Sequence, residues 1–335
     1  MTFREFKDLT VQRLASLYPE AEARAIAVRL LTSRLNVPDY KIAAEPATAI
    51  KPDALAALEA DLARLEEGCP LQYVLGYTEF AGLRIRVAPG CLIPRPETEE
   101  MVSLIIDALD AKSASASGQG GTLPPFCSAG PDGEAVASIE SESTLNILDI
   151  CTGSGCIAYA LADAFPEAQV FACDLSEAAL SIACKQRVKL PGARPVFFQA
   201  DVLQAPPAGL PKFDLIVSNP PYVMESERAA MRSNVLDYEP AEALFVPDDD
   251  PLRFYAAIRR WADALLAPGG EIWLEINEKL GPETAVVFGL RSSEAEASLG
   301  QKNPRSASAL SGASASTVQL LQDLSGKDRF LRIIK

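Results

Sequence analysis

The stretch that decides the fold is Leu145-Asn-Ile-Leu-Asp-Ile-Cys-Thr-Gly-Ser-Gly-Cys-Ile-Ala158, near the middle of a chain of 335 residues. A short apolar run, residues 145–150, leads directly into two glycines, and residues 156–164 then favour a helix. More apolar runs of this kind follow, separated by helical stretches such as residues 177–189. These runs are residues 168–174, 194–201, 212–219 and 270–276. Near-continuous apolar strands that alternate with helices predict an α/β domain, with a parallel sheet covered on both faces.

Polar side chains stand at the ends of the first four predicted strands. Asp149 lies one residue before the end of the first strand, and Asp174, Asp201 and Asn219 end the next three. The carboxyl ends of parallel strands lie at one edge of a sheet, and the ligands of such sheets bind there. The sequence therefore predicts a ligand site at this edge.

The glycine loop alone fits two kinds of ligand. Gly153 and Gly155 allow a sharp turn and a close approach of the backbone, and the helix that follows presents free N–H groups. With Ala158, and with Asp174 roughly 20 residues on, the spacing fits a dinucleotide such as NAD. However, Asp149 lies four residues before Gly153, where its charge would repel a pyrophosphate.

S-adenosylmethionine suits this acidic edge better, because it carries an ammonium and a sulfonium and no phosphate. Asp174 would accept hydrogen bonds from the ribose hydroxyls, and Asp201 would lie near the adenine amino group. Three acids at successive strand ends therefore predict S-adenosylmethionine as the cofactor. A non-catalytic module that binds NAD remains the alternative.

The tetrad Asn219-Pro220-Pro221-Tyr222 follows the fourth strand directly. Because two prolines cannot continue a parallel strand, the chain leaves the sheet here in a stiff, extended turn. A conjugated –NH₂ group is a poor nucleophile, and its two N–H donors need acceptors once it is desolvated. The Asn219 side-chain oxygen and the Pro220 carbonyl can accept one each, and Tyr222 offers a flat face for the planar group. The tetrad therefore predicts methyl transfer to such a nitrogen, with no general base.

Composition excludes several other kinds of chemistry. The chain has no histidine, which rules out Ser-His-Asp and Cys-His nucleophilic sites, an imidazole base and His-ligated zinc. Its seven cysteines form no C-x-x-C pair and fit reduced thiols of a cytoplasmic protein with no metal site. A net charge of −14 argues against direct binding of nucleic acid. The N-terminus lacks a signal-peptide pattern and no window is apolar enough to span a bilayer, so we expect no membrane contact.

The first 72 residues are predicted to form a small helical bundle. Thr2 and Glu5 have the spacing of a capping box, residues 20–35 form a second helix, and a third helix begins at Pro52. Residues 73–90 then predict a β-hairpin connector, since residues 73–87 have β-type composition around a turn at Gly82.

The remaining residues, 91–335, are predicted to form the α/β domain. Two low-complexity segments interrupt it, residues 112–143 and 291–317, both rich in Ser, Ala and Gly. They have too few large apolar residues to offset the entropy lost on ordering, so we expect mobile surface insertions.

Several longer motifs extend these patterns. They are residues 70–82 (PLQYVLGYTEFAG), Leu92-Ile-Pro-Arg-Pro-Glu-Thr-Glu99, the glycine loop, residues 213–223 (FDLIVSNPPYV), Tyr238-Glu-Pro with Ala243-Leu-Phe245, Pro268-Gly-Gly-Glu271, Glu275-Ile276 and Gly326-Lys-Asp-Arg329. Together they resemble the peptide-chain-release-factor glutamine methyltransferases, the HemK/PrmC family, over the whole chain apart from the two insertions. The resemblance implies a helical substrate-recognition domain, a hairpin connector and a Rossmann-like methyltransferase domain whose mostly parallel sheet ends in an antiparallel hairpin. The implied reaction is N5-methylation of the glutamine in the Gly-Gly-Gln motif of class 1 release factors.

Candidate site residues follow from the charge argument and from the resemblance. The cofactor site is expected to comprise Asp149, Cys151, Thr152, Gly153, Ser154, Gly155, Asp174, Asp201, Val202 and Asn219. The substrate site is expected to comprise Asn219, Pro220, Pro221 and Tyr222, with Asn219, Pro220 and Tyr222 in the catalytic step. The resemblance also implies that Arg95, Glu97 and Thr98 lie in a loop that packs beside the cofactor.

Three positions depart from the family pattern. Cys151 stands where the family has its first loop glycine, so we expect a negative φ there. Asn277 stands where a glycine is common, and Val202 replaces an aromatic residue that would stack on the adenine. None of these changes removes a hydrogen-bonding group from the tetrad, so they predict weaker cofactor binding at most.

Two other methyl acceptors remain open. DNA adenine-N6 methyltransferases share the tetrad, but residues 223–250 carry eight acids and two bases. That charge would repel a duplex and attract a basic, RNA-binding protein such as a release factor. A glutamine methyltransferase that acts on a ribosomal protein shares both the tetrad and the overall pattern. We expect a monomer whose protein partners are release factors.

Overall fold

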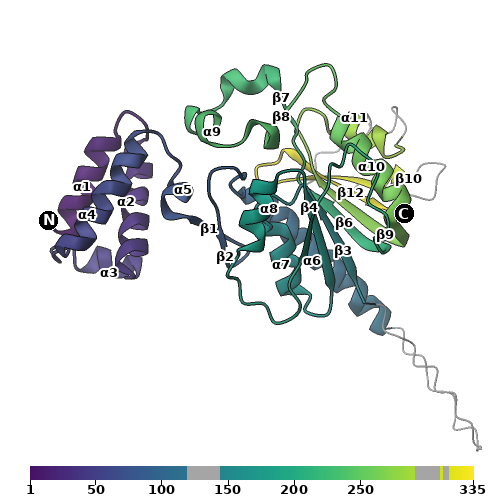
Figure 1. The fold of residues 1–335 in the computed structure, drawn as a ribbon, viewed down its shortest axis with the longest axis horizontal. Helices are drawn as coiled ribbons and strands as arrows, with labels where there is room; N and C mark the ends of the chain where they lie inside the picture. The colour runs from purple at the N-terminus through teal and green to yellow at the C-terminus, as the bar shows by residue number, and fades with distance from the viewer. Residues whose placement is uncertain (119–143, 291–309, 312–316) are drawn as a thin grey trace, which may run out of the picture.

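The N-terminal part of the chain is helical, and the rest forms an α/β unit beside it (Figure 1). The computed structural model describes residues 1–118, 144–290, 310–311 and 317–335. The helices of the first 75 residues are α1 (Phe3–Leu14), α2 (Glu20–Leu35), α3 (Asp39–Ala44), α4 (Pro52–Glu66) and α5 (Leu71–Leu75). None of the helices in the described ranges is both long and apolar enough to cross a membrane.

The predicted capping box is present at the start of α1. The Glu5 N–H donates to the Thr2 hydroxyl at 3.3 Å, and the Thr2 N–H donates to the Glu5 carboxylate at 2.8 Å. The second and third predicted helices are confirmed as α2 and α4, whereas the sequence does not predict α3 and α5. Helices this short are stabilised by packing rather than by propensity. Arg34 illustrates this, because it binds Asp61 of α4 and the carbonyl of Val74 in α5.

The hairpin connector is formed by β1 (Tyr77–Phe80) and β2 (Leu83–Arg86), which pair antiparallel. Ala81 and Gly82 have φ angles of 49° and 75°, as a type I′ turn requires at both central residues. The β-type composition is misleading at its start, because residues 73–75 belong to α5. They are buried against the bundle, and this packing outweighs their β propensity.

The central sheet confirms the predicted fold class. In the described part of the chain its strand order is β10-β11-β12-β9-β6-β3-β4-β5, parallel from β5 to β9 and antiparallel beyond. The strands are β3 (Asn146–Ile150), β4 (Gln169–Asp174), β5 (Val196–Gln199), β6 (Phe213–Ser218), β9 (Leu266–Glu275), β10 (Leu310–Ser311), β11 (Thr317–Gln322) and β12 (Asp328–Ile334). The predicted mostly parallel sheet with an antiparallel end is therefore present.

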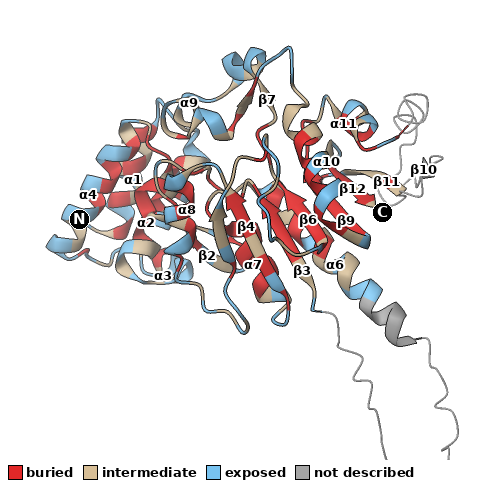
Figure 2. Cartoon of the chain, turned by 45° about the vertical axis from the view of Figure 1, so that its right-hand side comes forward, coloured by how far each residue is buried: buried red, intermediate tan, exposed pale blue. Residues whose placement is uncertain are grey.

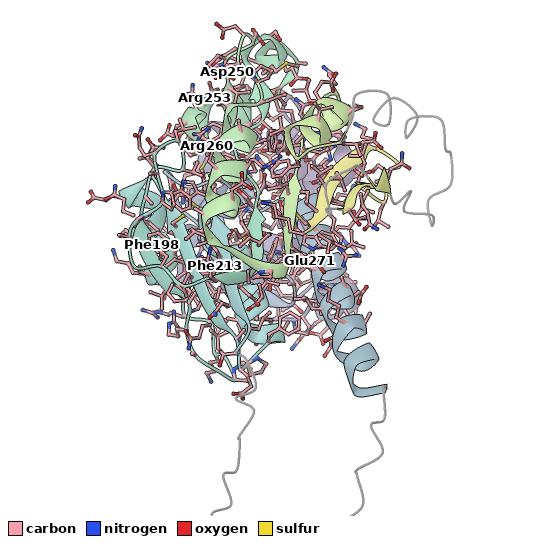
Figure 3. All side chains as sticks on the ribbon, turned by 90° about the vertical axis from the view of Figure 1, so that its right-hand side faces the viewer. Phe198, Phe213, Asp250, Arg253, Arg260 and Glu271 are labelled. Carbon is pink, nitrogen blue, oxygen red and sulfur yellow. The ribbon has the colours of Figure 1, made fainter. Side chains whose placement is uncertain are left out.

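Helices cover both faces of this sheet. On one face lie α6 (Pro96–Gly118) and α7 (Cys156–Ala164), and on the other α10 (Arg253–Leu265) and α11 (Gly281–Val287). Helix α8 (Glu177–Cys184) packs beside β4 and β5. The central strands β3, β6 and β9 are therefore buried along most of their length (Figure 2). Figure 3 looks onto the α10 face, where Phe198 and Phe213 belong to the core that α10 covers.

The segment between β6 and α10 lies above the carboxyl edge of the sheet (Figure 1). It contains β7 (Val223–Met224) paired with β8 (Phe245–Val246), the helix α9 (Ser233–Tyr238), and the 3₁₀ helices η1 (Glu225–Ala230) and η2 (Ala241–Ala243). This segment supplies one wall of the site described below.

Two predicted extents are wrong. Helix α6 continues through Gly118, into the stretch 112–143 that the sequence marks as an insertion, and α8 ends at Cys184 rather than near residue 189. The rest of that stretch lies outside the described residues. So does most of the stretch 291–317, apart from β10 and the first residue of β11.

Candidate active site

A pocket of about 270 Å³ opens at the carboxyl edge of the sheet. Strand β3 lies there between β4 and β6, where the strand order reverses, which is where sheets of this kind bind their ligands. Its walls come from the loops after β3, β4, β5 and β6, from residues 90–98, from residues 240–243 and from Phe254 of α10. The volume lies near the lower end of the range for small-molecule sites, roughly 300 Å³.

The structure brings most of the predicted site residues together in this pocket. The lining includes Cys151, Thr152, Gly153, Ser154, Asp174, Asp201, Val202, Asn219, Pro221 and Thr98. Six predicted residues lie outside that lining: Asp149, Gly155, Pro220, Tyr222, Arg95 and Glu97. Of these, Asp149, Tyr222 and Arg95 bind residues that line the pocket or support its wall, as described below.

The loop after β3 is tied to Asp174. The Gly153 N–H donates to Asp174 Oδ2 at 2.8 Å, and the Ser176 N–H donates to Asp174 Oδ1 at 2.9 Å. A loop that binds pyrophosphate must offer its N–H groups to the phosphate oxygens. Here a carboxylate already accepts one of them, so the pocket presents negative charge where a dinucleotide would place its own.

Asp149 lies beneath this loop and is fully buried. Its Oδ2 accepts hydrogen bonds from the Thr152 hydroxyl at 2.5 Å and from the Ala158 N–H at 3.2 Å. Its Oδ1 has no hydrogen-bond partner among the described residues. Burial raises the pKa of this carboxyl to about 7, although the two hydrogen bonds act in the opposite direction. A cationic ligand above the loop would favour its ionised form.

Cys151 has a φ of 61°, so the negative φ expected there is wrong. The backbone keeps the left-handed conformation for which a glycine is suited, and the cysteine adopts it at a cost of about 1–2 kcal/mol. Its neighbour Thr152 donates an N–H to the Cys173 carbonyl at 3.0 Å, which fixes the loop to β4. The turn geometry is therefore imposed by the sheet and not by the residue type.

Gly155 serves packing rather than the pocket wall. It has a φ of 81° and immediately precedes α7. A Cβ at this position would come within 3.1 Å of the Phe197 ring and 3.2 Å of the Tyr159 ring. The glycine therefore allows α7 to approach the edge of the sheet closely.

The tetrad after β6 is held by a buried acid of β9. Asn219 Nδ2 donates to Thr98 Oγ1 at 2.9 Å, and that hydroxyl lies 2.6 Å from Glu275 Oε2. The Tyr222 hydroxyl donates to the other carboxylate oxygen, Glu275 Oε1, at 2.8 Å. Among the described residues, no group donates to Asn219 Oδ1. This oxygen is therefore a free acceptor on a residue that lines the pocket.

Glu275 is not among the site residues predicted from the sequence. It is the last residue of β9 and is 1% exposed, and burial raises its pKa while the Thr98 and Tyr222 hydroxyls lower it. An acid at the carboxyl end of a strand is the signal that identified Asp149, Asp174 and Asp201. The fifth strand carries the same signal.

Residues of the loop 94–98 have two different roles. Arg95 pairs with Glu239 at 2.7 Å, and the second oxygen of Glu239 accepts the Ile93 N–H at 3.0 Å. Arg95 thus joins the loop to the segment above the pocket, whereas Thr98 enters the pocket. Glu97 is half-buried, and its charge raises the pKa of Glu275.

Asn277, one of the departures from the family pattern, supports the tetrad. Its Nδ2 lies 3.0 Å from the Tyr222 carbonyl and 2.8 Å from Glu227 Oε2, and its Oδ1 accepts the Lys279 N–H. Val202, another departure, is 5% exposed and lines the pocket as an apolar surface. Phe254, which the sequence reading does not single out, supplies an aromatic side chain in the same pocket.

The pocket fits S-adenosylmethionine by the chemistry of its donor set. Its lining offers carboxylate acceptors and apolar surface, and the unpartnered Oδ1 of Asp149 lies beneath the loop. The Gly153 N–H of that loop is already bound to Asp174. Such a pocket suits a ligand with hydroxyls and positive charge, and it disfavours a pyrophosphate. On a sheet of this topology, these properties define the protein as an S-adenosylmethionine-dependent methyltransferase.

Comparison with known proteins identifies the family. The PrmC N-terminal domain family matches residues 8–76, and the Methyltransferase small domain family matches residues 135–238. The chain is 39% identical over 272 residues to the release factor glutamine methyltransferase of Bacteroides thetaiotaomicron, covering 81% of this chain and 86% of that protein. It is 37% identical over 284 residues to the enzyme of the same name from Flavobacterium psychrophilum, covering 85% and 90%. The chain belongs to the release factor glutamine methyltransferase family.

Proposed function

We propose that this protein transfers a methyl group from S-adenosylmethionine to the side-chain nitrogen, N5, of the glutamine in the Gly-Gly-Gln motif of a class 1 release factor. The observation that carries the proposal is the free acceptor oxygen of Asn219, which lines an acidic pocket at the end of β6. Membership of the family directs the proposal to release factors, because the relatives at 37–39% identity are named for that substrate.

On the cofactor side, acids of this chain would hold the ligand. Asp174 Oδ2 accepts the Gly153 N–H and Oδ1 accepts the Ser176 N–H, and the carboxylate can also accept from a ribose hydroxyl. Asp201 accepts the Leu203 N–H at 2.9 Å and can also accept from the adenine amino group. Asp149 adds negative charge beneath the loop, opposite a ligand ammonium. When bound, S-adenosylmethionine supplies an electrophilic methyl group on a sulfonium.

On the acceptor side, the tetrad would orient a primary amide. Asn219 Oδ1 and the Pro220 carbonyl accept one N–H each, which directs the nitrogen lone pair toward the methyl group. Both acceptors also stabilise the positive charge that develops on nitrogen in the transition state. The Tyr222 hydroxyl is fixed by Glu275, so its ring can offer a constant face to the amide plane. The methylated nitrogen then loses its proton to water, and no histidine is needed.

The surface beside the pocket would attract a basic partner. Between residues 223 and 250 the exposed acids are Glu225, Asp237, Glu242, Asp248, Asp249 and Asp250, and the exposed bases are Arg228 and Arg232. The other two acids of this segment bind inside the protein: Glu239 binds Arg95, and Glu227 binds Asn277 and Lys279. The exposed charge is thus less negative than the sequence alone suggests, but it still favours a basic protein over a nucleic acid.

We propose that residues 1–72 recognise the release factor, that residues 73–90 connect them to the methyltransferase domain, and that the enzyme acts as a cytoplasmic monomer without membrane contact. The six cysteines in the described ranges are all free, as a reducing compartment favours.

Transfer of labelled methyl groups tests the function. Purified protein and labelled S-adenosylmethionine are incubated with a release factor, with its Gln→Ala variant in the Gly-Gly-Gln motif, with ribosomal proteins and with DNA. We expect label in the intact release factor alone, on the peptide that contains the motif. Label in DNA or in ribosomal proteins, or label that persists in the variant factor, would contradict the proposal.

Calorimetry separates the enzyme from a simple nucleotide-binding module. S-adenosylmethionine should bind and NAD should not, because the acids of the pocket repel a pyrophosphate. The reverse result would exclude the methyltransferase.

A further inference from the structure

An asparagine amide has two ends of nearly equal size and opposite hydrogen-bonding character. The Asn219 side chain can fill the same space with Oδ1 or with Nδ2 toward the pocket, and only Oδ1 can accept an N–H from an acceptor amine. If Nδ2 faced the pocket, its N–H groups would meet the N–H groups of the methyl acceptor. Other groups of the protein must therefore determine which end of the amide faces the pocket.

The hydroxyl of Thr98 fixes it, because that hydroxyl has a single proton. Thr98 Oγ1 lies 2.6 Å from Glu275 Oε2 and 2.9 Å from Asn219 Nδ2. When Glu275 is ionised its carboxylate can only accept, so the Thr98 proton then points at Glu275. The Thr98 oxygen is then left to accept, and it takes its hydrogen bond from Asn219 Nδ2. Asn219 Oδ1 is consequently the end that is left for the pocket.

Glu275 is itself held so that this direction cannot easily reverse. Its Oε1 accepts the Tyr222 hydroxyl at 2.8 Å, so both carboxylate oxygens face donors. The side chain is fully buried at the end of β9, where the charge of Arg329 opposes the effect of burial. Buried networks of this kind orient their members strongly, since an unsatisfied group inside the protein is costly.

We propose that Thr98 and Glu275 are positioning residues that set the polarity of the Asn219 amide and thereby select an acceptor that presents N–H donors. This selection rests on the proposed function for the identity of the acceptor, a glutamine amide. We therefore expect the enzyme to discriminate against a glutamate at the position of the glutamine, because a carboxylate presents only hydrogen-bond acceptors to Asn219 Oδ1. Neither residue touches the reacting atoms, since Thr98 acts through Asn219, and Glu275 acts through Thr98 and through the Tyr222 hydroxyl.

Three substitutions test the polarity. Thr98→Val keeps the shape and removes the hydroxyl, Thr98→Ser keeps the hydroxyl, and Glu275→Gln allows Thr98 to face either a donor or an acceptor. Thr284→Val is the matched control, because Thr284 is a fully buried threonine in α11 whose hydroxyl binds the Leu280 carbonyl. We expect Thr98→Val and Glu275→Gln to lower kcat by at least about 10-fold, with the dissociation constant for S-adenosylmethionine within about 3-fold of wild type. Thr98→Ser should restore most of the kcat lost in Thr98→Val, and the control Thr284→Val should stay within about 3-fold of wild type in kcat.

The ratio of affinities for glutamine and glutamate is a second measurement. A variant that is only less stable or less well packed should keep this ratio unchanged. The release factor with Gln→Glu in the Gly-Gly-Gln motif is used as an inhibitor, and its inhibition constant is compared with the KM of the intact factor. In Thr98→Val the amide can turn its Nδ2 toward the carboxylate. The preference for glutamine should therefore fall by about 10-fold or more, and Thr98→Ser should restore it. An unchanged kcat and an unchanged preference in Thr98→Val would overturn the inference.

A third measurement tests the polarity without any methyl acceptor. Six asparagines occur in the chain, so selective ¹⁵N labelling gives few side-chain amide signals, and Asn219→Asp identifies the one from Asn219. The Asn219 Nδ2 hydrogens should exchange with solvent at least about 10-fold faster in Thr98→Val than in wild type or Thr98→Ser, because they lose their acceptor. Equal exchange rates in all three proteins would refute the inference. If wild type fails to methylate the release factor while these rates differ as expected, the proposed function is wrong and the polarity stands.

Discussion

Asp149 makes the free protein less stable than it would be with a neutral side chain, and this gives a quantitative prediction. Its pKa is raised from 3.8 to about 7 by burial. The folded protein therefore retains a proton at pH values where the unfolded chain has lost it, so the free energy of unfolding falls as pH rises from about 4 to about 7. At about 1.4 kcal/mol per pH unit, the full loss above pH 7 is about 4 kcal/mol.

Asp149→Asn should recover part of this loss. The new side-chain oxygen can still accept from Thr152 and Ala158, whereas the new –NH₂ takes the place of Oδ1, which has no partner among the described residues. An unpaired buried donor costs about 1–3 kcal/mol. The variant should thus be more stable than wild type by about 1–3 kcal/mol at pH 8.5. The wild type regains about 3 kcal/mol between pH 8.5 and pH 5 as its folded carboxyl binds a proton, whereas the variant does not titrate, so at pH 5 the variant should be between equal to wild type and about 2 kcal/mol less stable.

The same substitution should weaken cofactor binding, because it removes the charge beneath a cationic ligand. We expect the dissociation constant for S-adenosylmethionine to rise by at least about 10-fold. Urea denaturation at both pH values measures stability, and calorimetry measures binding. Asp214→Asn controls for the loss of one charge, since Asp214 lies in the neighbouring strand β6 and accepts the Asn146 N–H at 2.9 Å. A variant that is less stable than wild type by the same amount at both pH values would refute the reasoning.

Three further substitutions have distinct expected results. Asn219→Ala should lower turnover by at least about 10²-fold while the cofactor dissociation constant stays within about 3-fold, and normal turnover in the labelled-methyl assay would contradict its role. Cys151→Gly should be more stable to urea than Cys151→Ala by about 0.5–1 kcal/mol, because φ at this position is 61°. The opposite order would show that the left-handed backbone carries no strain. Glu239→Ala should lower the free energy of unfolding by about 3–5 kcal/mol, because it leaves Arg95 and the Ile93 N–H without their partner. A loss below about 1 kcal/mol would mean that the pair contributes little.

Local patterns in the sequence determined much of the fold. The capping box at Thr2, the turn at Gly82 and the alternation of apolar strands with helices all depend on residues within a few positions of one another. The strand-end acids were predicted to share one edge because parallel strands bring their carboxyl ends together, and the pocket contains Asp174, Asp201 and Asn219. Where local preference and packing conflicted, as at residues 73–75, the sequence reading failed.

The details of the site were decided by contacts between residues far apart in the chain. Asn219 meets Thr98 across 121 positions, and Thr98 meets Glu275 across 177. Arg95 and Glu239 are 144 positions apart in the sequence. Such pairs cannot be predicted from periodicity or residue spacing, because the order of the strands in the sheet determines which loops lie at the same edge.

The class of fold, the acidic character of the site and the residues of the tetrad could thus be predicted from the order of residues along the chain and from their charge. The left-handed backbone of Cys151, the full burial of Asp149 and the hydrogen bonds that link Glu275 to Asn219 through Thr98 appear only in the folded chain. The physical reason is that backbone conformation, burial and hydrogen-bond direction are set by neighbours in space, and those neighbours exist only once the chain has folded.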